Sequence, residues 1–159
     1  MLRITYVGHA TVLIEMDGTR VLTDPILRRN TGSLRRVGRP VDPAVYAALD
    51  GVLLTHMHAD HLNLASLRLI DEGIPIIAPD GASAWLRSKR LVHVSELDVG
   101  AETRVGALRI TATPALHDGR RRPFGGPRAT PMGFLIEGSK VVYFAGDTNV
   151  FGDMALIRR

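Results

Sequence analysis

Three histidines and one aspartate lie within six residues of one another, in the segment His-Met-His-Ala-Asp-His at positions 56–61. The segment follows directly on an apolar run that is typical of a buried strand. Side chains repeat every two residues along an extended backbone, so His56, His58 and Asp60 can leave the strand end on one side. The next turn brings His61 back toward them. A polar loop with accidental histidines would have to satisfy each buried imidazole nitrogen. The spacing therefore favours a metal site with imidazole and carboxylate ligands.

The composition limits what other chemistry the chain can do. Its 159 residues contain no cysteine, which excludes a disulfide scaffold, an iron–sulfur cluster and a thiol nucleophile. The proportions of 45% hydrophobic and 23% charged residues are those of a folded globular protein. We expect one domain over residues 1–159. No apolar run approaches the ~20 residues of a membrane span and the start does not read as a secretory signal, so we expect a cytoplasmic location.

The elements that must position these side chains alternate between strands and short helices. Runs rich in β-branched residues predict strands, and Asp17-Gly18 predicts a hairpin turn. An Arg-, Gly- and Pro-containing loop is expected over residues 26–42. The predicted strands are residues 2–7, 11–16, 19–23, 51–55, 74–78, 91–94, 108–113, 132–137 and 140–144. The predicted helices cover parts of residues 64–71 and 80–86, and a last helix begins near Phe151.

Three further segments extend the pattern at positions 56–61. They are Gly8–Glu15 with Leu22–Pro25, then Thr113–His117, and finally Tyr143–Thr148. Over residues 2 to about 152 their order and spacing resemble the metallo-β-lactamase superfamily of metal-dependent hydrolases. The first of them resembles the branch that contains the N-acyl-phosphatidylethanolamine-hydrolysing phospholipase D and the ascorbate-6-phosphate lactonase. The resemblance implies an α/β fold, the αββα sandwich of that superfamily.

The resemblance also implies a role for each residue of the site. It implies that His56, His58 and His117 bind a first metal ion. It also implies that Asp60 and His61 bind a second ion and that Asp147 bridges both. Zn²⁺ is the expected ion, with Mn²⁺ or Fe as alternatives. Two ions ~3.5–4 Å apart can hold a hydroxide and polarise a phosphoryl or acyl oxygen. Asp60 could also orient that hydroxide, which makes it the candidate catalytic residue.

Two further residues have both a structural and a functional interpretation. His9 alone would fit a surface or core histidine, but the resemblance adds a role beside the metal site. Asp24, which precedes Pro25, could accept a hydrogen bond from a ligating imidazole or could simply form a turn. Both interpretations stay open at this point. His93 lies in a β-branched run without a partner at ligand spacing, and we expect it to be structural.

The chain departs from the family pattern after His117. The family places a final histidine of the second metal site in its C-terminal part, and no histidine follows His117 here. The strand over residues 140–144 is followed by a polar turn and a short helical start, which leaves the predicted sheets short of helical cover. We therefore expect a sandwich without its final C-terminal segment, with a complete first metal site and a weak or empty second one. A fragment, a truncated product and a domain completed by another chain would each explain this pattern.

These features favour a hydrolase that uses a metal-bound hydroxide on a phosphodiester, a lactone or a related ester. A small anionic or phospholipid-like substrate would agree with the Arg-rich loop and with Arg120–Arg122, although solvated loops are the more ordinary explanation. The alternative is a catalytically incompetent metal-binding half-domain that requires a partner chain, or the missing C-terminal segment, and a homo-oligomer is one form of it. Nucleic acid is disfavoured as a partner because no aromatic residues are interleaved with the arginines.

Overall fold

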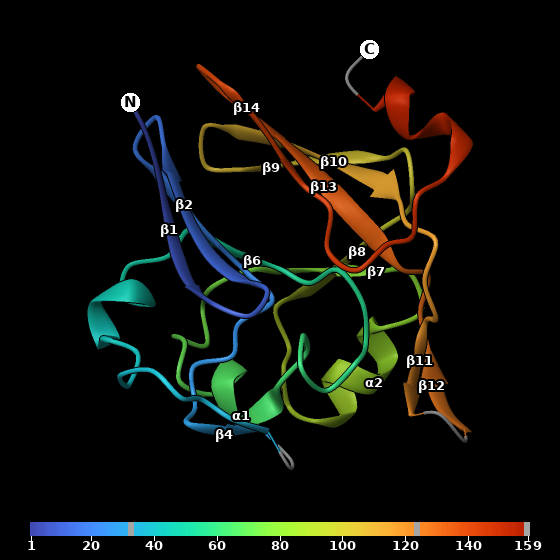
Figure 1. Ribbon diagram of the computed structural model, residues 1–159. Coiled ribbons are helices and arrows are strands. Elements are labelled where there is room, and N and C mark those ends of the chain that lie inside the picture. The colour runs from blue at the N-terminus through green and yellow to red at the C-terminus, as the bar shows by residue number, and fades with distance from the viewer. Residues whose placement is uncertain (32–33, 123–124, 158–159) are drawn as a thin grey trace.

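The computed structural model describes residues 1–31, 34–122 and 125–157, and in this part the chain forms two large β-sheets (Figure 1). The first sheet has six strands in the order β1 (Leu2–Gly8), β2 (Thr11–Met16), β3 (Thr19–Thr23), β6 (Gly51–Leu53), β7 (Ile76–Pro79) and β8 (Val94–Leu97). The second has four, in the order β14 (Val141–Phe144), β13 (Met132–Glu137), β10 (Leu108–Pro114) and β9 (Glu102–Val105). The second sheet is antiparallel throughout, whereas β3, β6, β7 and β8 pair in parallel.

The two sheets pack face to face over one apolar core. Ile14, Val21 and Leu53 of the first sheet contact a cluster that includes Phe134 and Ile136 of the second, and all five side chains are buried. Strands β6 and β7 are buried along their whole length because they are covered on both faces, which is the usual position of parallel strands. In β10 buried residues alternate with more exposed ones over its first half, as in a strand with one face on a core.

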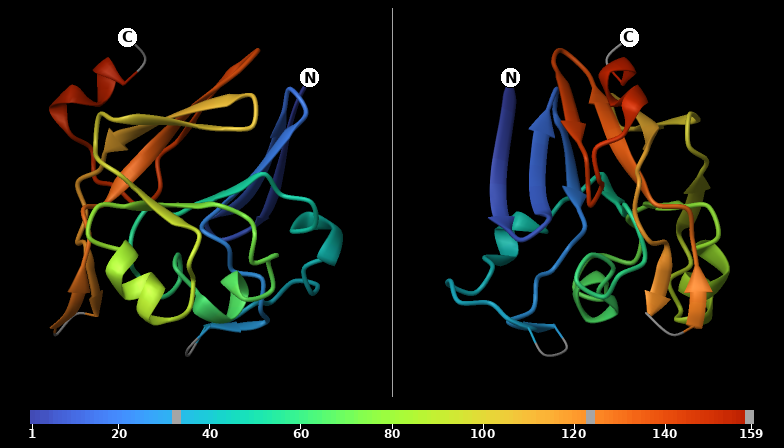
Figure 2. Two further views of the ribbon diagram at one scale, coloured as in Figure 1. Left: turned by 180° about the vertical axis from the view of Figure 1, so that it is seen from behind. Right: turned by 45° about the vertical axis from the view of Figure 1, so that its right-hand side comes forward.

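The other face of the six-stranded sheet is covered by the two described α-helices, α1 (Leu64–Leu67) and α2 (Ser83–Ser88). Figure 2 shows both helices on the side of this sheet that faces away from β13 and β14. The described residues add two 3₁₀ helices, η1 (Pro43–Val45) and η2 (Gly152–Leu156). Helix, sheet and sheet are thus three of the layers of the expected αββα sandwich. No helix in the described part of the chain is long and apolar enough to span a membrane.

Several predicted elements are wrong in position or type. The strand predicted over residues 91–94 lies at Val94–Leu97, and strand β9 was not predicted because its sequence, Glu-Thr-Arg-Val, lacks apolar alternation. Arg120–Arg122, for which a solvated loop was the ordinary explanation, form strand β11 (Arg120–Arg122), which pairs with β12 (Gly125–Arg128) in a hairpin. The loop predicted over residues 26–42 contains a second small hairpin, β4 (Asn30–Thr31) and β5 (Leu34–Arg35). The last helix is a 3₁₀ helix, and parts of both hairpin turns lie outside the described residues.

The candidate site residues follow the ends of strands from both sheets. Asp24 follows β3, the segment 56–61 follows β6, His117 follows β10 and Asp147 follows β14. The backbone amide of Asp24 donates to the carbonyl of Leu53 at 2.9 Å, which joins the ends of β3 and β6. The amide of Met132 donates to the carbonyl of Thr55 at 3.0 Å, which joins the two sheets at this place. Segments that are far apart in sequence therefore meet where the sheets meet.

Candidate metal centre

His56 lies at the centre of a cluster of imidazole rings. Its ring centroid is 4.1 Å from that of His61, 4.7 Å from that of His58 and 4.8 Å from that of His117. The side chains of His56 and His61 are buried, and those of His58 and His117 are partly exposed. Imidazolium ions this close would repel one another, so the arrangement disfavours several charged rings at once.

His58 and His117 face each other across this cluster although 59 residues separate them in sequence. The Nδ1 atom of His58 lies 3.1 Å from the Nε2 atom of His117. Two nitrogens that bind one tetrahedral Zn²⁺ at ~2.0–2.1 Å are ~3.3 Å apart. Together with His56 these residues form a group whose ligand atoms all lie within 4.8 Å of one another. The spacing fits one metal ion held by three imidazoles.

Asp24 supports the cluster from beneath and is completely buried. Its Oδ1 accepts a hydrogen bond from the backbone amide of Thr55 at 2.8 Å. Its Oδ2 accepts one from the hydroxyl of Thr55 at 2.6 Å and lies 2.8 Å from Nδ1 of His61. The Thr55 hydroxyl oxygen also lies 2.9 Å from Nδ1 of His56. A single carboxylate is therefore connected to two imidazoles, directly to His61 and through Thr55 to His56.

This network fixes which nitrogen of each ring carries the proton. The carboxylate of Asp24 can only accept, so Nδ1 of His61 donates to it. The Thr55 hydroxyl uses its one proton on Asp24 and must therefore accept from Nδ1 of His56. In the neutral rings both Nε2 atoms are then lone-pair acceptors. Both are buried without a hydrogen-bond partner, and Nε2 of His61 faces the Asp147 carboxylate at 3.3 Å. Unpaired buried acceptors are costly unless a cation occupies their lone pairs. These two orphaned atoms are the strongest indication that the residues fit a metal ion.

Two further carboxylates lie on the open side of the cluster. The Oδ2 atom of Asp147 is 3.3 Å from Nε2 of His61 and 3.8 Å from Nε2 of His117, so it lies between the two rings. The Oδ2 atom of Asp60 is 3.0 Å from Nε2 of His9 and 3.9 Å from Nε2 of His61. Asp60, His61 and His9 form a second group of close ligand atoms. Asp147 therefore lies near His117 of the first group and near His61 of the second.

The environment sets the charge of these groups. Burial, followed by the neighbouring imidazoles, lowers the pKa of His56 to about 2. Burial also acts against the charged form of His61, but its hydrogen bond to Asp24 and the nearby carboxylates outweigh this and raise its pKa above the ordinary 6.5. Burial opposes ionisation of Asp60, yet a backbone hydrogen bond and the charges of His61 and His9 hold its pKa below 3.8. At neutral pH, His56 is neutral and Asp60 is ionised, which are the forms that bind metal.

The turns that carry His117 and Asp147 are joined to each other. The amide of Leu116 donates to the hydroxyl of Thr148 at 2.9 Å, so the residues next to the two candidate ligands are in contact. Gly146 precedes Asp147 with a φ of +60°, and a Cβ there would lie 2.8 Å from Cγ2 of Thr55. Only glycine allows the turn to approach this closely, and the approach brings the Asp147 carboxylate to the imidazoles.

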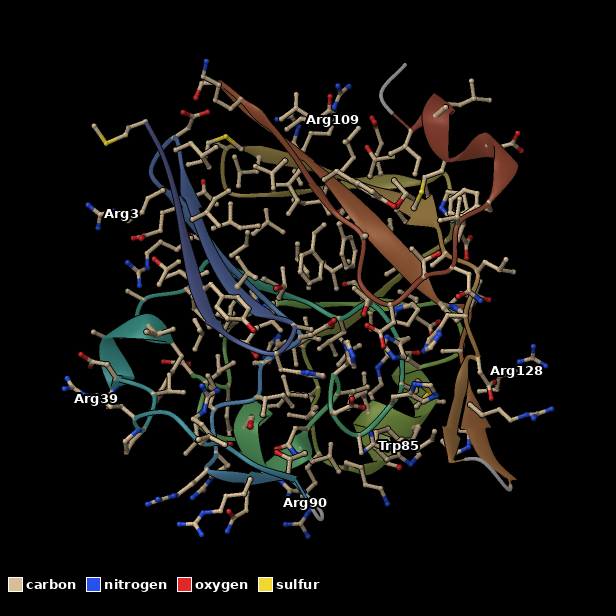
Figure 3. The ribbon with its side chains drawn as sticks, viewed as in Figure 1. Arg3, Arg39, Trp85, Arg90, Arg109 and Arg128 are labelled. Atoms are coloured by element: carbon tan, nitrogen blue, oxygen red, sulfur yellow. The ribbon has the colours of Figure 1, made fainter. Side chains whose placement is uncertain are left out.

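Arg121, from the β11–β12 hairpin, holds the segment 56–61 from outside. One terminal guanidinium nitrogen donates to the carbonyl of Met57 and to that of Leu62, both at 2.6 Å. The guanidinium carbon lies 4.8 Å from the ring centroid of Trp85, which comes from α2. Figure 3 shows Trp85 between α2 and this hairpin. One cation therefore binds the backbone at both ends of the metal motif and stacks on an aromatic ring.

The structure brings the six predicted ligands into one place and sets His9 and Asp24 against them. His93 lies outside the cluster, and its carbonyl accepts a hydrogen bond from the amide of Ile76. Sequence patterns gave Thr55 no role, and they placed Arg121 only in a run of arginines suited to solvent or to anions. Thr55 could have been found, because a hydroxyl directly before His56 can relay a hydrogen bond. Arg121 could not, because its carbonyl partners are 64 and 59 residues away and no local pattern marks such a contact.

Comparison with known sequences shows the family to which this chain belongs. The family model described as "Beta-lactamase superfamily domain" matches residues 19–159. A UPF0173 metal-dependent hydrolase of Rubrobacter xylanophilus is 36% identical over 98% of this chain, which corresponds to 64% of that relative. A UPF0173 metal-dependent hydrolase of Methanopyrus kandleri is 35% identical over 98% of this chain. The chain spans only about two thirds of the length of these curated relatives, 64% and 66%.

Solved structures share the fold. CmlA, a diiron β-hydroxylase from Streptomyces venezuelae, superposes with a TM-score of 0.77 at 26% identity, covering 96% of this chain and 31% of CmlA. Igni18, a metallo hydrolase from the archaeon Ignicoccus hospitalis, superposes with a TM-score of 0.72 at 26% identity, covering 98% of this chain and 65% of Igni18. Both similarities extend over nearly the whole of this chain.

Proposed function

Since this chain belongs to the beta-lactamase superfamily, we propose that it holds metal ions at the cluster around His56 and hydrolyses an ester bond of a small anionic molecule. The observation that carries the proposal is the pair of buried Nε2 atoms, on His56 and His61, that have no hydrogen-bond partner. Two acceptors prepared by one carboxylate, with no protein donor facing them, are a poor arrangement for stability alone. They are a good arrangement for metal binding.

The distances suggest how the ligands are divided. His56, His58 and His117 would hold a first ion, because their ligand atoms form one compact group. Asp60 and His61 would contribute to a second, and Asp147, which lies between His61 and His117, would bridge the two. His9 stands beside Asp60 and is the one further imidazole within reach of the second position.

The residues around the metal position have separate tasks in this proposal. A bound divalent cation would supply a lowered pKa for water and polarisation of the ester oxygen. Asp60 is ionised at neutral pH and partly exposed, so it can accept a proton from the attacking water and orient it. Nε2 of His9 lies 3.0 Å from Oδ2 of Asp60 and so fixes the orientation of the carboxylate that accepts the proton. Asp24 holds His61 in the ligating tautomer.

Zn²⁺ is the ion that this donor set suits best, since imidazole and carboxylate ligands without thiolate are common in catalytic zinc sites. Mn²⁺ and Fe remain alternatives in the proposal, and a solved structure of the same fold is described as diiron. The proposal also includes a cytoplasmic location, for which the cysteine-free sequence is the support.

The test is metal content and turnover in matched variants. The chain is saturated with Zn²⁺, dialysed and analysed for bound metal, and its activity on bis-p-nitrophenyl phosphate and on a p-nitrophenyl ester is measured. The double variant His56→Ala/His58→Ala should lose the metal and all turnover. His93→Ala removes a histidine outside the cluster and should retain both. Equal metal content in the double variant and the unchanged chain would refute the proposal.

A second candidate function is a metal-binding portion that needs further chain for turnover. The observation in its favour is that this chain covers about two thirds of the length of its curated relatives, 64% and 66%. On this alternative the chain binds metal through the same residues but hydrolyses neither substrate, and self-association into a homo-oligomer would be one way to complete the site. Metal content without turnover, together with the mass in solution from light scattering, distinguishes it from the first candidate.

A further inference from the structure

A cavity of about 440 Å³ opens beside the candidate metal centre, on the side of the β4–β5 hairpin. His9 and Asp60 form the part of its wall that faces the metal cluster, and Val7 and Ile26 supply apolar surface. Its volume lies within the ~300–1,000 Å³ of small-molecule sites. A molecule that fills this cavity would therefore contact Asp60, the residue proposed to handle the attacking water.

Four arginines line this cavity, namely Arg28, Arg29, Arg35 and Arg36, and Asp60 is the one acidic residue in the lining. Among the described residues, the arginines that pair with a carboxylate all lie elsewhere in the fold. Cations gathered without counter-charges repel one another, and an anion among them removes that repulsion. The charge of the cavity wall thus favours an anionic occupant.

Arg36 has a different task from the other three. Its two terminal nitrogens donate to the carbonyls of Val7 and Ile26, at 2.6 and 2.7 Å. Gly8 has a φ of +134°, and a Cβ there would lie 2.6 Å from the Arg36 guanidinium. The arginine-bearing loop is thereby tied to the end of β1, directly before His9. The side chains of Arg28, Arg29 and Arg35 are exposed and stay available for a ligand.

Two further observations assign the anion to this side of His9. The hydroxyl of Thr31 lines the cavity and is buried without a hydrogen-bond partner, so it can donate to a ligand oxygen. On the other side of His9, a second cavity of about 440 Å³ is lined by Tyr6, Phe144 and Asp147, among others, and by no lysine or arginine. The two cavities that border His9 therefore differ in charge.

We propose that the cavity lined by Arg28, Arg29 and Arg35 binds the phosphate group of a small phosphorylated substrate, whose ester bond then lies at Asp60. The proposal rests on the proposed hydrolase function and adds the group that is recognised and the residues that recognise it. Guanidinium groups suit phosphate because they donate two parallel hydrogen bonds to its oxygens. The uncharged remainder of the substrate would extend toward Tyr6 and Phe144.

The experiment measures binding of glycerol 3-phosphate to the Zn²⁺-loaded chain by calorimetry at low ionic strength. Arg28→Gln, Arg29→Gln and Arg35→Gln are compared with Arg39→Gln, which removes an arginine of the same loop that does not line the cavity. Figure 3 shows Arg39 at the outer edge of the molecule. Each cavity variant should weaken binding about three- to ten-fold, and Arg39→Gln should not. Raising the salt concentration should reduce the difference between them.

Two outcomes would overturn the proposal. Equal affinity in all variants would mean that phosphate binds at the metal and not at the arginines. The second outcome is that the unchanged chain binds vesicles of phosphatidylcholine with phosphatidylglycerol but not glycerol 3-phosphate, and that the cavity variants lose the vesicle binding. The arginines would then form a lipid-binding surface. Uncharged glycerol is the negative control, and it should not bind.

The same binding experiment in the His56→Ala/His58→Ala background separates this inference from the proposed function. Arginine-dependent binding that persists without metal and without turnover supports the phosphate cavity even if the hydrolase proposal fails. If the chain hydrolyses its substrate and the variants at Arg28, Arg29 and Arg35 leave both KM and kcat unchanged, the phosphate-binding proposal is refuted and the hydrolase proposal stands. A rise in KM with little change in kcat is the expected result for groups that bind the substrate away from the reacting bond.

Discussion

The isosteric change Asp24→Asn should weaken metal binding although it leaves every candidate ligand in place. If the Asn carbonyl keeps the bond to the Thr55 amide, its NH₂ group replaces Oδ2 and faces Nδ1 of His61 and the Thr55 hydroxyl. Both partners must then accept instead of donate, and the proton of each ring moves to Nε2. The reversed side chain would instead point NH₂ at the buried Thr55 amide, which would lose its acceptor.

The magnitude follows from the three hydrogen bonds that Asp24 accepts, at 2.6, 2.8 and 2.8 Å. A bond to a charged group contributes ~1.5–3 kcal/mol and a neutral one ~0.5–1.5, a difference of ~1–1.5 kcal/mol per bond. Over three bonds, loss of the charge should lower the free energy of unfolding of the metal-free chain by about 3–4.5 kcal/mol. Metal affinity should fall about 10–100-fold, which is the usual effect of removing a partner that orients a ligand.

The assay is competition for Zn²⁺ against a chromophoric chelator, with the fold checked by circular dichroism and urea unfolding. Asp42→Asn is the matched control, because Asp42 accepts from the amide of Ala44 at the start of η1 on the surface. Asn and Asp are nearly equivalent at such a cap, so this variant should match the unchanged chain in metal affinity and stability. A folded Asp24→Asn chain that binds Zn²⁺ within two-fold of the unchanged chain would refute the tautomer argument.

Three further outcomes are expected. Arg121→Ala should lower the free energy of unfolding, measured in urea, by about 2–4 kcal/mol and should weaken Zn²⁺ binding, because two backbone carbonyls lose a charged donor and Trp85 loses its stacking partner. Arg120→Ala, at the exposed neighbouring position, is the control and should have neither effect. Removing the metal with a chelator should lower Tm by an amount that depends on free Zn²⁺ concentration; a Tm that ignores Zn²⁺ would contradict coupled binding and folding. Burial opposes ionisation of Glu96, but hydrogen bonds from Ser83 outweigh it and hold the pKa of Glu96 below 4.5. The contribution of Glu96 to stability should therefore be present above pH 4.5 and be lost as the pH falls through the lowered pKa. Glu96→Gln should remove that part of the acid-unfolding profile, and an unchanged profile would contradict this expectation.

The ligand cluster could be predicted because its information is local or comes in short segments. The spacing of His56, His58, Asp60 and His61 is a property of six consecutive residues, and apolar strands such as Met132–Glu137 were predicted in place. Strand Glu102–Val105 was missed because it is polar and depends on β10 for its partner. Its pairing is tertiary, and no periodicity within four residues reveals it.

The supporting contacts were less accessible for the same reason. Whether Asp24 forms a turn or orients an imidazole depends on His61, which is 37 residues away, and the structure shows the contact. Arg121 belongs to a run of three arginines that composition alone assigns to solvent or to anions, yet its guanidinium binds two carbonyls of the metal motif. Residue type could not separate these roles, since the same cation suits phosphate, water and backbone carbonyls.

The position of the cluster connects metal binding to the packing of the two sheets. His56, His58 and His61 follow β6 of the first sheet, while His117 and Asp147 follow β10 and β14 of the second. The sheets are joined here by the Met132 to Thr55 hydrogen bond and by the approach of Asp147 to Nε2 of His61 at 3.3 Å. The Nε2 atoms of His56 and His61 have no hydrogen-bond partner. An ion bound by ligands of both sheets would be ligated by the lone pairs of those nitrogens and so would connect the two layers. The affinity for metal and the stability of the sheet–sheet contact are then the same free energy, so a substitution that loosens either one should be detected in both.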